Sequence, residues 1–104
     1  MILTTTDEVP GRKIAETIGL VRGSSVRTAH IGRDVMAKLK NLVGGEVTEY
    51  TKLLAESREQ ALDRMVEEAR ARGADAIVGV RFMSSDIGDD DAEMLAYGTA
   101  VRLA

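Results

Sequence analysis

Cysteine is absent from this chain of 104 residues. Disulfide frameworks, thiolate metal sites and cysteine nucleophiles are therefore excluded. Aromatic residues make up 3% of the chain, and histidine and proline each occur once, so a core would have few large anchors. A basic excess is also missing, because 14 Lys and Arg stand against 17 Asp and Glu for a formal net charge of -3. A general nucleic-acid binder needs a basic face to neutralise phosphates, so the composition argues against that class.

The chain also lacks a long hydrophobic run. Its first basic residue is Arg12, whereas a secretory signal begins with basic residues and has a longer apolar stretch than Ile2-Leu3. No stretch approaches the roughly 20 apolar residues that span a bilayer. We therefore expect a cytoplasmic protein without membrane contact, and the length predicts a single domain over residues 1–104.

The sequence does contain a series of periodic segments. Strands are predicted at residues 2–5 and, as one long bent strand, at 13–27. Apolar residues spaced by four, four and three predict a helix at 32–42, and an apolar stripe opposite a charged one predicts a longer helix at 49–72 that ends at Gly73. The apolar run at 74–83 indicates a strand covered on both faces, and 93–103 a last strand. The order β-β-α-α-β-β indicates an α+β domain, a small β-sheet packed with two helices.

Small residues mark one face of the predicted strands. Gly19 and Gly23 lie in the long second strand, and Gly79 and Gly98 lie in the last two strands. Glycine inside a strand often marks a bulge or the close approach of another backbone. The periodicity is equally compatible with a neighbouring subunit and with a helix of the same chain.

Residues with metal-binding chemistry are few. Because His30 is the only histidine, no Ser-His-Asp triad and no two-histidine metal site can form within one chain. His30 precedes the predicted helix at 32–42, where an ordinary polar residue is the commoner interpretation, but an oligomer would repeat it symmetrically. The acidic residues at 86–91 lack the alternate spacing of a calcium loop, which favours a solvated loop.

A second group of polar residues follows a glycine pair. Gly44-Gly45 is followed by Glu46 and, one helical turn later, by Tyr50, and these side chains could line a pocket. Glu46 would repel a phosphate, and no base or nucleophile accompanies it. The sequence therefore predicts no catalytic residue and no enzyme. A small hydrolase or isomerase that uses Glu46 with Tyr50 is the least favoured alternative.

Several blocks of the sequence together resemble one known family. They are Val43-Gly44-Gly45-Glu46 with residues 49–54, the helical blocks 57–62 and 65–69, the strand block 73–82 and the ending 97–101. In combination they are similar to the YbjQ-like family, small bacterial and archaeal proteins described as "putative heavy-metal-binding" domains. The resemblance covers essentially the whole chain. It implies a subunit similar in architecture to dodecin subunits, assembled into a ring that is commonly a pentamer.

With this resemblance, we expect a non-enzymatic homo-oligomer, a pentamer, that binds a small ligand at its subunit interfaces. The candidate ligand or interface residues are Gly19, Gly23, Gly44, Gly45, Glu46, Tyr50, Gly79 and Gly98. The alternative is a metal-binding protein that holds a divalent ion with His30 and carboxylates from several subunits. Softer heavy metals favour thiolate and imidazole ligands, whereas the chain has no cysteine and one histidine.

Overall fold

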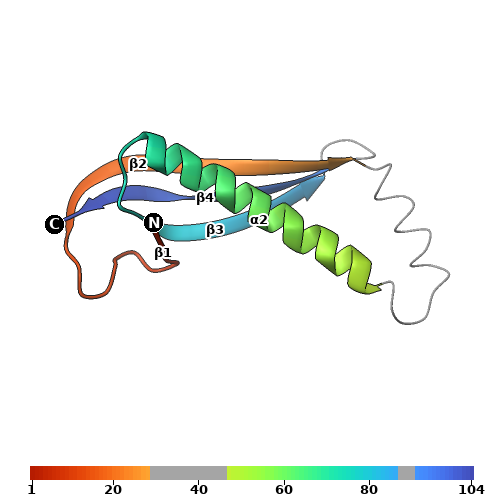
Figure 1. Cartoon of the computed structure of the whole chain (residues 1–104), viewed down its shortest axis with the longest axis horizontal. Coiled ribbons are helices and arrows are strands. Elements are labelled where there is room, and N and C mark those ends of the chain that lie inside the picture. Colours follow the sequence, from red (N-terminus) through yellow and green to blue (C-terminus); the bar gives the residue numbers. More distant parts are fainter. Residues whose placement is uncertain (29–46, 87–90) are drawn as a thin grey trace.

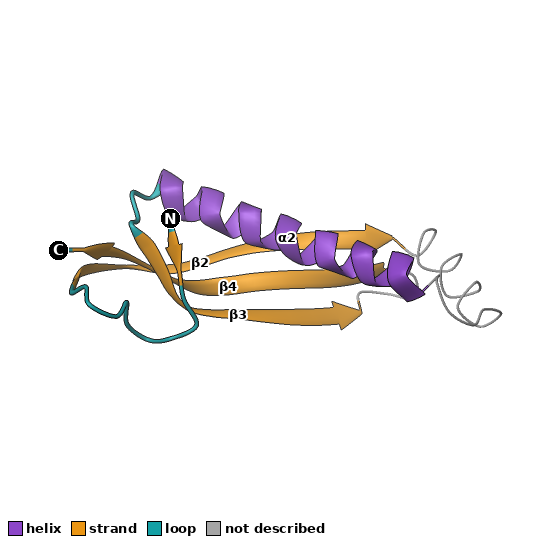
Figure 2. Cartoon of the chain, turned by 60° about the horizontal axis from the view of Figure 1, so that its bottom comes forward, coloured by secondary structure: helices purple, strands orange, loops and turns teal. Residues whose placement is uncertain are grey.

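The computed structural model describes residues 1–28, 47–86 and 91–104. Its elements in chain order are β1 (Ile2–Leu3), β2 (Ile14–Thr28), α2 (Val47–Ala71), β3 (Ala76–Asp86) and β4 (Asp91–Leu103). The strands form one mixed sheet in the order β1-β3-β4-β2, in which β1 is parallel to β3 and the other neighbours are antiparallel. The helix α2 crosses one face of this sheet diagonally (Figure 1, Figure 2).

The expected order β-β-α-α-β-β, with two helices on the sheet, is wrong. The described residues contain one helix, and their elements follow the order β-β-α-β-β. One helix covers much of this face, because 25 residues at 1.5 Å each make α2 about 37 Å long. The helix predicted at 32–42 lies outside the described residues, and a single chain does not show the expected ring.

The helix at 49–72 is confirmed, and its buried side consists of small or flexible residues. Ser57, Ala61, Met65 and Ala69 recur every four residues and are at most 3% exposed. The helix ends at Ala71 in a Schellman motif: the N–H of residue 74 donates to the carbonyl of residue 69, and that of residue 73 to residue 70, both at 3.0 Å. Gly73 has a φ of 78°, which explains why glycine suits this position. In the ranges that the structure describes, no helix is both long and apolar enough to cross a membrane.

The sheet carries a buried cluster on each face. On the α2 side, Val21, Ile77 and the small residues Ala96 and Ala100 pack with the helix. On the opposite face a second cluster, formed by Val9 from the segment before β2 with residues 76, 78 and 101, is at most 7% exposed. The expectation that the third strand is covered on both faces therefore holds for its first residues. The largest fully buried side chains include no aromatic ring among the described residues, as the composition suggested.

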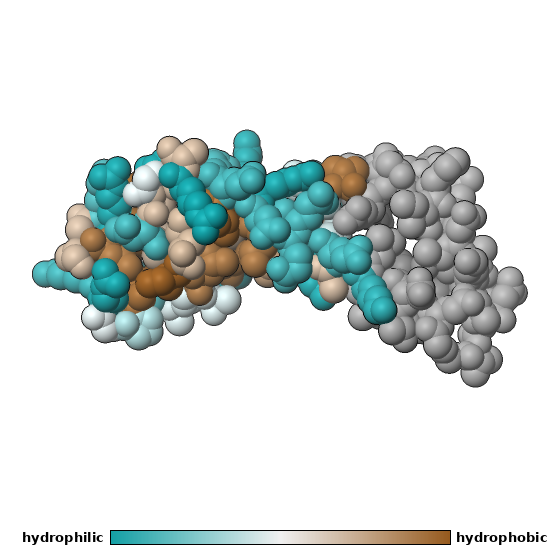
Figure 3. All heavy atoms as spheres, viewed as in Figure 1, coloured by the Kyte–Doolittle hydropathy of each residue, from teal (hydrophilic) through white to brown (hydrophobic). Residues whose placement is uncertain are grey.

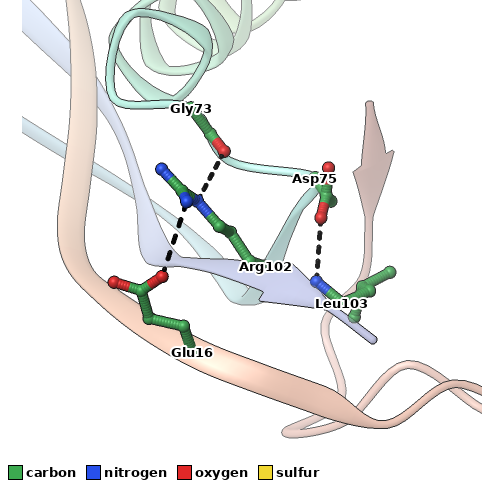
Figure 4. A network of polar contacts seen from close by, with 5 residues as sticks. All are labelled: Glu16, Gly73, Asp75, Arg102 and Leu103. Carbon is green, nitrogen blue, oxygen red and sulfur yellow. Dashed lines mark hydrogen bonds and ion pairs between the residues drawn. The ribbon is translucent and has the colours of Figure 1, made fainter.

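Arg102 connects the end of α2 to the ends of two strands. Its Nε donates to the carbonyl oxygen of Gly73 at 3.2 Å, and its Nη1 lies 3.7 Å from a carboxylate oxygen of Glu16 on β2 (Figure 4). Beside it, a carboxylate oxygen of Asp75 accepts a hydrogen bond from the N–H of Leu103 at 2.9 Å. Both partners of the ion pair are more than half exposed, so it contributes at most about 1 kcal/mol. These contacts place the helix end over the sheet.

Candidate functional site on the uncovered face of the sheet

On the sheet face opposite α2, one part is not covered by any other described residue. Residues 21, 23 and 25 of β2 are buried beneath α2, so the residues between them point to the other face. Two large side chains on that side, Leu20 and Val26, are 60% and 48% exposed, and Met83 of β3 is 55% exposed. We call this surface, formed by the outward residues within 20–26, 81–85 and 93–99, the open face. Large apolar side chains left exposed on one face of a sheet favour contact with another molecule there.

Two arginines flank a tyrosine at the centre of the open face. Arg22, Tyr97 and Arg81 are direct register partners on three neighbouring strands, so their side chains form one row across the sheet. Because neighbouring strands are about 4.8 Å apart, the two arginines start about 10 Å apart. The Nη1 of Arg81 donates to the carbonyl oxygens of Thr5 and Val80, both at 2.9 Å, which holds that guanidinium beside the N-terminal segment. The row places two positive charges on a surface that also carries apolar side chains and, two rows away, the carboxylate of Glu93.

Charged side chains of α2, together with Arg72 directly after its end, cover the outer edge of β2. Arg72 donates to the carbonyl oxygens of residues 20 and 18 at 2.7 and 3.1 Å, and Arg64 donates to that of residue 24. Glu68 accepts a hydrogen bond from the backbone N–H of residue 22 at 3.2 Å. Free backbone groups on an edge strand invite pairing with other chains. At residues 18–24 this edge is therefore blocked by the helix.

The outer edge of β3 is protected over a shorter length. The N-terminal segment pairs with it as far as Val80, whose N–H donates to the carbonyl of Thr4 at 3.0 Å. Beyond that point, no strand among the described residues pairs with the outer edge of β3, which is opposite β4. Phe82, on the α2 side of this edge, is 46% exposed. The open face and this edge are adjacent.

Two of the predicted interface glycines allow close packing within the chain. A Cβ atom on Gly23 would lie 2.3 Å from both the carbonyl oxygen of Ala61 and the backbone nitrogen of Met65. One on Gly98 would lie 2.7 Å from a methyl carbon of Ile77. The sequence left open whether the small-residue face receives a subunit or a helix. At Gly23 it receives the chain's own helix.

The other two predicted interface glycines that the structure describes, Gly19 and Gly79, adopt positive φ angles. Gly79 has a φ of 61° where the register of β3 against β4 shifts, and its N–H donates to the carbonyl of Thr6 at 2.8 Å. Gly19 has a φ of 135° beside a register shift in β2, and a Cβ there would lie 3.3 Å from the Arg72 guanidinium. Both glycines thus have a backbone role, and a further role at an interface stays a prediction.

The remaining predicted site residues are not positioned by the structure. His30, Gly44, Gly45 and Glu46 lie outside the described residues. Tyr50 lies near the start of α2, but its side chain is outside what the structure describes. The pocket of Glu46 and Tyr50 and the metal role of His30 therefore stay predictions.

A heavy-metal site does not fit the residues that the structure describes. Within residues 1–28, 47–86 and 91–104, no three Cys, His, Asp or Glu side chains come together to hold an ion. The full chain has no thiolate donor and a single imidazole, whereas soft metals prefer these ligands.

A buried polar cluster beneath α2 is internally satisfied. The hydroxyl of Ser25 donates to the side-chain oxygen of Gln60 at 2.8 Å, and the hydroxyl of Ser57 donates to Ser25 at 3.2 Å. Each hydroxyl proton is thus engaged, and no imidazole or carboxylate takes part in these two bonds. The cluster stabilises the contact between helix and sheet and does not resemble an activated nucleophile.

The residues that organise the open face and the blocked edge were not predicted from the sequence. Arg64, Glu68 and Arg72 recur every four residues on one side of the helix, but that spacing is also typical of ion pairs within a helix. Arg22 and Arg81 interrupt apolar strands, and nothing in the sequence shows that they share a row. The alternation of side chains along each strand places every arginine on one of two faces. Only the strand register shows that the two arginines lie in the same row.

The chain is similar to known proteins over essentially its whole length. A family model described as "Putative heavy-metal-binding" matches residues 1–104. A UPF0145 protein of Vibrio parahaemolyticus is 56% identical over 103 residues, which is 99% of this chain and 98% of the relative. A UPF0145 protein of Methanosarcina acetivorans is 52% identical over the same length, 99% of this chain and 97% of the relative. A crystal structure from Pediococcus pentosaceus, of unknown function and from the DUF74 family, has the same fold, with a TM-score of 0.65 at 15% identity over 100% of this chain and 98% of that one.

Proposed function

Since the chain belongs to the YbjQ-like family described as "Putative heavy-metal-binding", whose relatives carry the name UPF0145 protein, we propose that it is a non-enzymatic homo-oligomeric module. Five copies assemble, and a small ligand binds at the interface between copies. The observation that carries this proposal is the open face, where Leu20, Val26 and Met83 are about half exposed or more. Burying such side chains contributes about 25 cal/mol of favourable free energy per Å² of apolar area, so contact with a second copy over the open face would be favourable.

Native mass spectrometry of untagged protein, purified without chelator, tests this proposal. Five chains of 11.2 kDa give an expected mass of about 56 kDa. Any excess over the mass of the chains measures a bound ion or small molecule. A monomer at micromolar concentration and physiological salt would overturn the proposal.

The description of the family favours a second candidate, a metal-binding protein. In this alternative, His30 and carboxylates from several copies hold a divalent ion. Metal content measured before and after His30→Ala decides the matter. Stoichiometric metal that is lost in the variant supports the alternative, whereas equal, substoichiometric metal in both proteins removes it.

A further inference from the structure

The outward side of α2 carries a continuous acidic stripe. Glu56, Glu59, Asp63 and Glu67 are spaced by three, four and four residues, so they share one face of the helix, and all four are exposed. This face is opposite the buried stripe of residues 57, 61, 65 and 69 and points away from the sheet. Figure 3, which views the molecule from the α2 side, shows hydrophilic residues along this surface. We call these four residues the acidic stripe.

The centre of the acidic stripe lacks a basic neighbour on the helix. No Lys or Arg lies three or four residues before or after Glu59 or Asp63. Like charges at this spacing repel each other and destabilise a helix. The guanidinium of Arg64, the next residue along, is engaged at the edge of β2. A positive charge from outside the helix would relieve this repulsion.

The open face carries positive charge of matching spacing. Arg22 and Arg81 start about 10 Å apart on either side of Tyr97, because two strand separations divide them. Glu56 and Asp63 are seven residues apart, which on a helix is also about 10 Å. Among the described residues, the ion pair is that of Arg102 with Glu16, so neither open-face arginine has a carboxylate partner there.

We propose that the open face of one copy receives the acidic stripe of a second copy. In this contact α2 of the second copy lies along the row of Arg22, Tyr97 and Arg81. Its Glu56 and Asp63 face the two guanidiniums, and its Glu59 lies over the tyrosine. The contact rests on the proposed homo-oligomer and identifies the surfaces that form it.

Two other arrangements are disfavoured by charge and by the fold. Two open faces packed against each other would place Arg22 and Arg81 against the same pair in the partner, and like charges in a contact oppose binding. Face-to-face contact also pairs copies in twos, whereas contact between two different surfaces repeats and can close after five copies. Pairing through the edge of β2 is opposed by the side chains that already bond it.

The absence of cysteine allows a direct test by cross-linking. Thr99→Cys places a thiol on the open face beside Tyr97, and Glu59→Cys places one in the acidic stripe. In the double variant the two thiols lie on opposite sides of the molecule, so a short bis-maleimide cannot join them within one chain. We expect the double variant to form a ladder of cross-linked species, up to five chains, on denaturing electrophoresis. Each single variant should remain uncross-linked.

The outcomes separate this contact from the proposed oligomer. Dimers from Thr99→Cys alone indicate face-to-face packing and overturn the inference. No ladder from a double variant that has the mass of an oligomer also overturns it but leaves the proposed function standing. A monomeric mass for the unmodified protein removes the proposed function itself.

A charge reversal tests the same contact in the absence of added thiols. Arg22→Glu should raise the concentration at which half of the oligomer dissociates by tenfold or more. Adding Glu56→Arg and Asp63→Arg to the same chain should reverse most of that change. Arg58→Glu, an exposed change on α2 outside the acidic stripe, is the matched control and should leave dissociation unchanged. Equal dissociation of Arg22→Glu and the unmodified protein, with the far-ultraviolet circular dichroism of both preserved, contradicts the inference.

Discussion

Replacing Gly23 with alanine tests how closely α2 packs on the sheet. The added Cβ would lie 2.3 Å from backbone atoms of Ala61 and Met65, and 2.8 Å from the carbonyl carbon of Arg64. These are atoms of the helix backbone, which cannot turn aside as a flexible side chain can. An ordinary contact is at least 3.4 Å, so the helix must retreat by about 1 Å.

The cost follows from the contacts that this retreat weakens. A gap of about 1 Å removes up to roughly half of the dispersion energy of a contact, and the buried stripe of α2 would lose it along several residues. Overpacked cores typically lose about 1–3 kcal/mol, and a clash with backbone belongs at the upper end. For a domain of this size, a loss of about 3 kcal/mol lowers Tm by about 12 °C. Thermal unfolding followed by circular dichroism measures this shift.

The neighbouring residue supplies a matched control. Ser24 points to the open face and is half-buried, so Ser24→Ala should change stability by no more than about 0.5 kcal/mol. All proteins are compared at one concentration, because assembly raises apparent stability. A Tm for Gly23→Ala within about 2 °C of the unmodified protein would mean that the helix does not approach the sheet as closely as described.

Two further substitutions test the edge of β2 and the bulge of β3. Arg72→Ala removes the hydrogen bonds to the carbonyls of residues 18 and 20, so we expect the free energy of unfolding in denaturant to fall by about 1–2 kcal/mol. Light scattering should show faster aggregation, because the edge of β2 becomes free to pair. Unchanged scattering would argue against a protective role of Arg72. Gly79→Val should lower the free energy of unfolding by about 1–2 kcal/mol because φ is 61° there, and Gly79→Asn should lower it less. Since nothing lies within 4 Å of a Cβ at that position, equal losses for the two variants would contradict a backbone origin.

The four strands and the long helix could be predicted from local patterns. The apolar stripe of 49–72 and Gly73 placed α2 within two residues of its bounds, because these signals depend only on neighbouring residues. The prediction that two helices pack on the sheet was wrong, because the periodicity of a segment does not show whether there is room for it on the sheet. The strand order was also beyond local signals, because β1 pairs with β3 across more than 70 residues.

The candidate site was harder to predict because it depends on register. In the last strand small residues alternate with larger ones such as Leu95 and Tyr97, and this alternation does not show which face is buried. In the structure the small residues Ala96, Gly98 and Ala100 are buried, and their larger neighbours are only half-buried. Ala96 and Ala100 are buried because they pack in one cluster with Ala61, Met65 and Ala69 of α2. Only the pairing of strands shows that Arg22 and Arg81 share a row with Tyr97.

The distribution of cover over the sheet argues for assembly through a face. The helix protects one face with its buried stripe and the β2 edge with Arg64, Glu68 and Arg72, so its charged residues are divided between two tasks. The helix residues that remain exposed include the acidic stripe, whose neighbouring charges repel one another. Of the exposed apolar side chains, Leu20, Val26 and Met83 lie on the opposite surface, around Arg22 and Arg81. Binding of the acidic stripe to the open face of a second copy would relieve both costs with one contact, which no arrangement within a single copy can do because the sheet lies between the two surfaces.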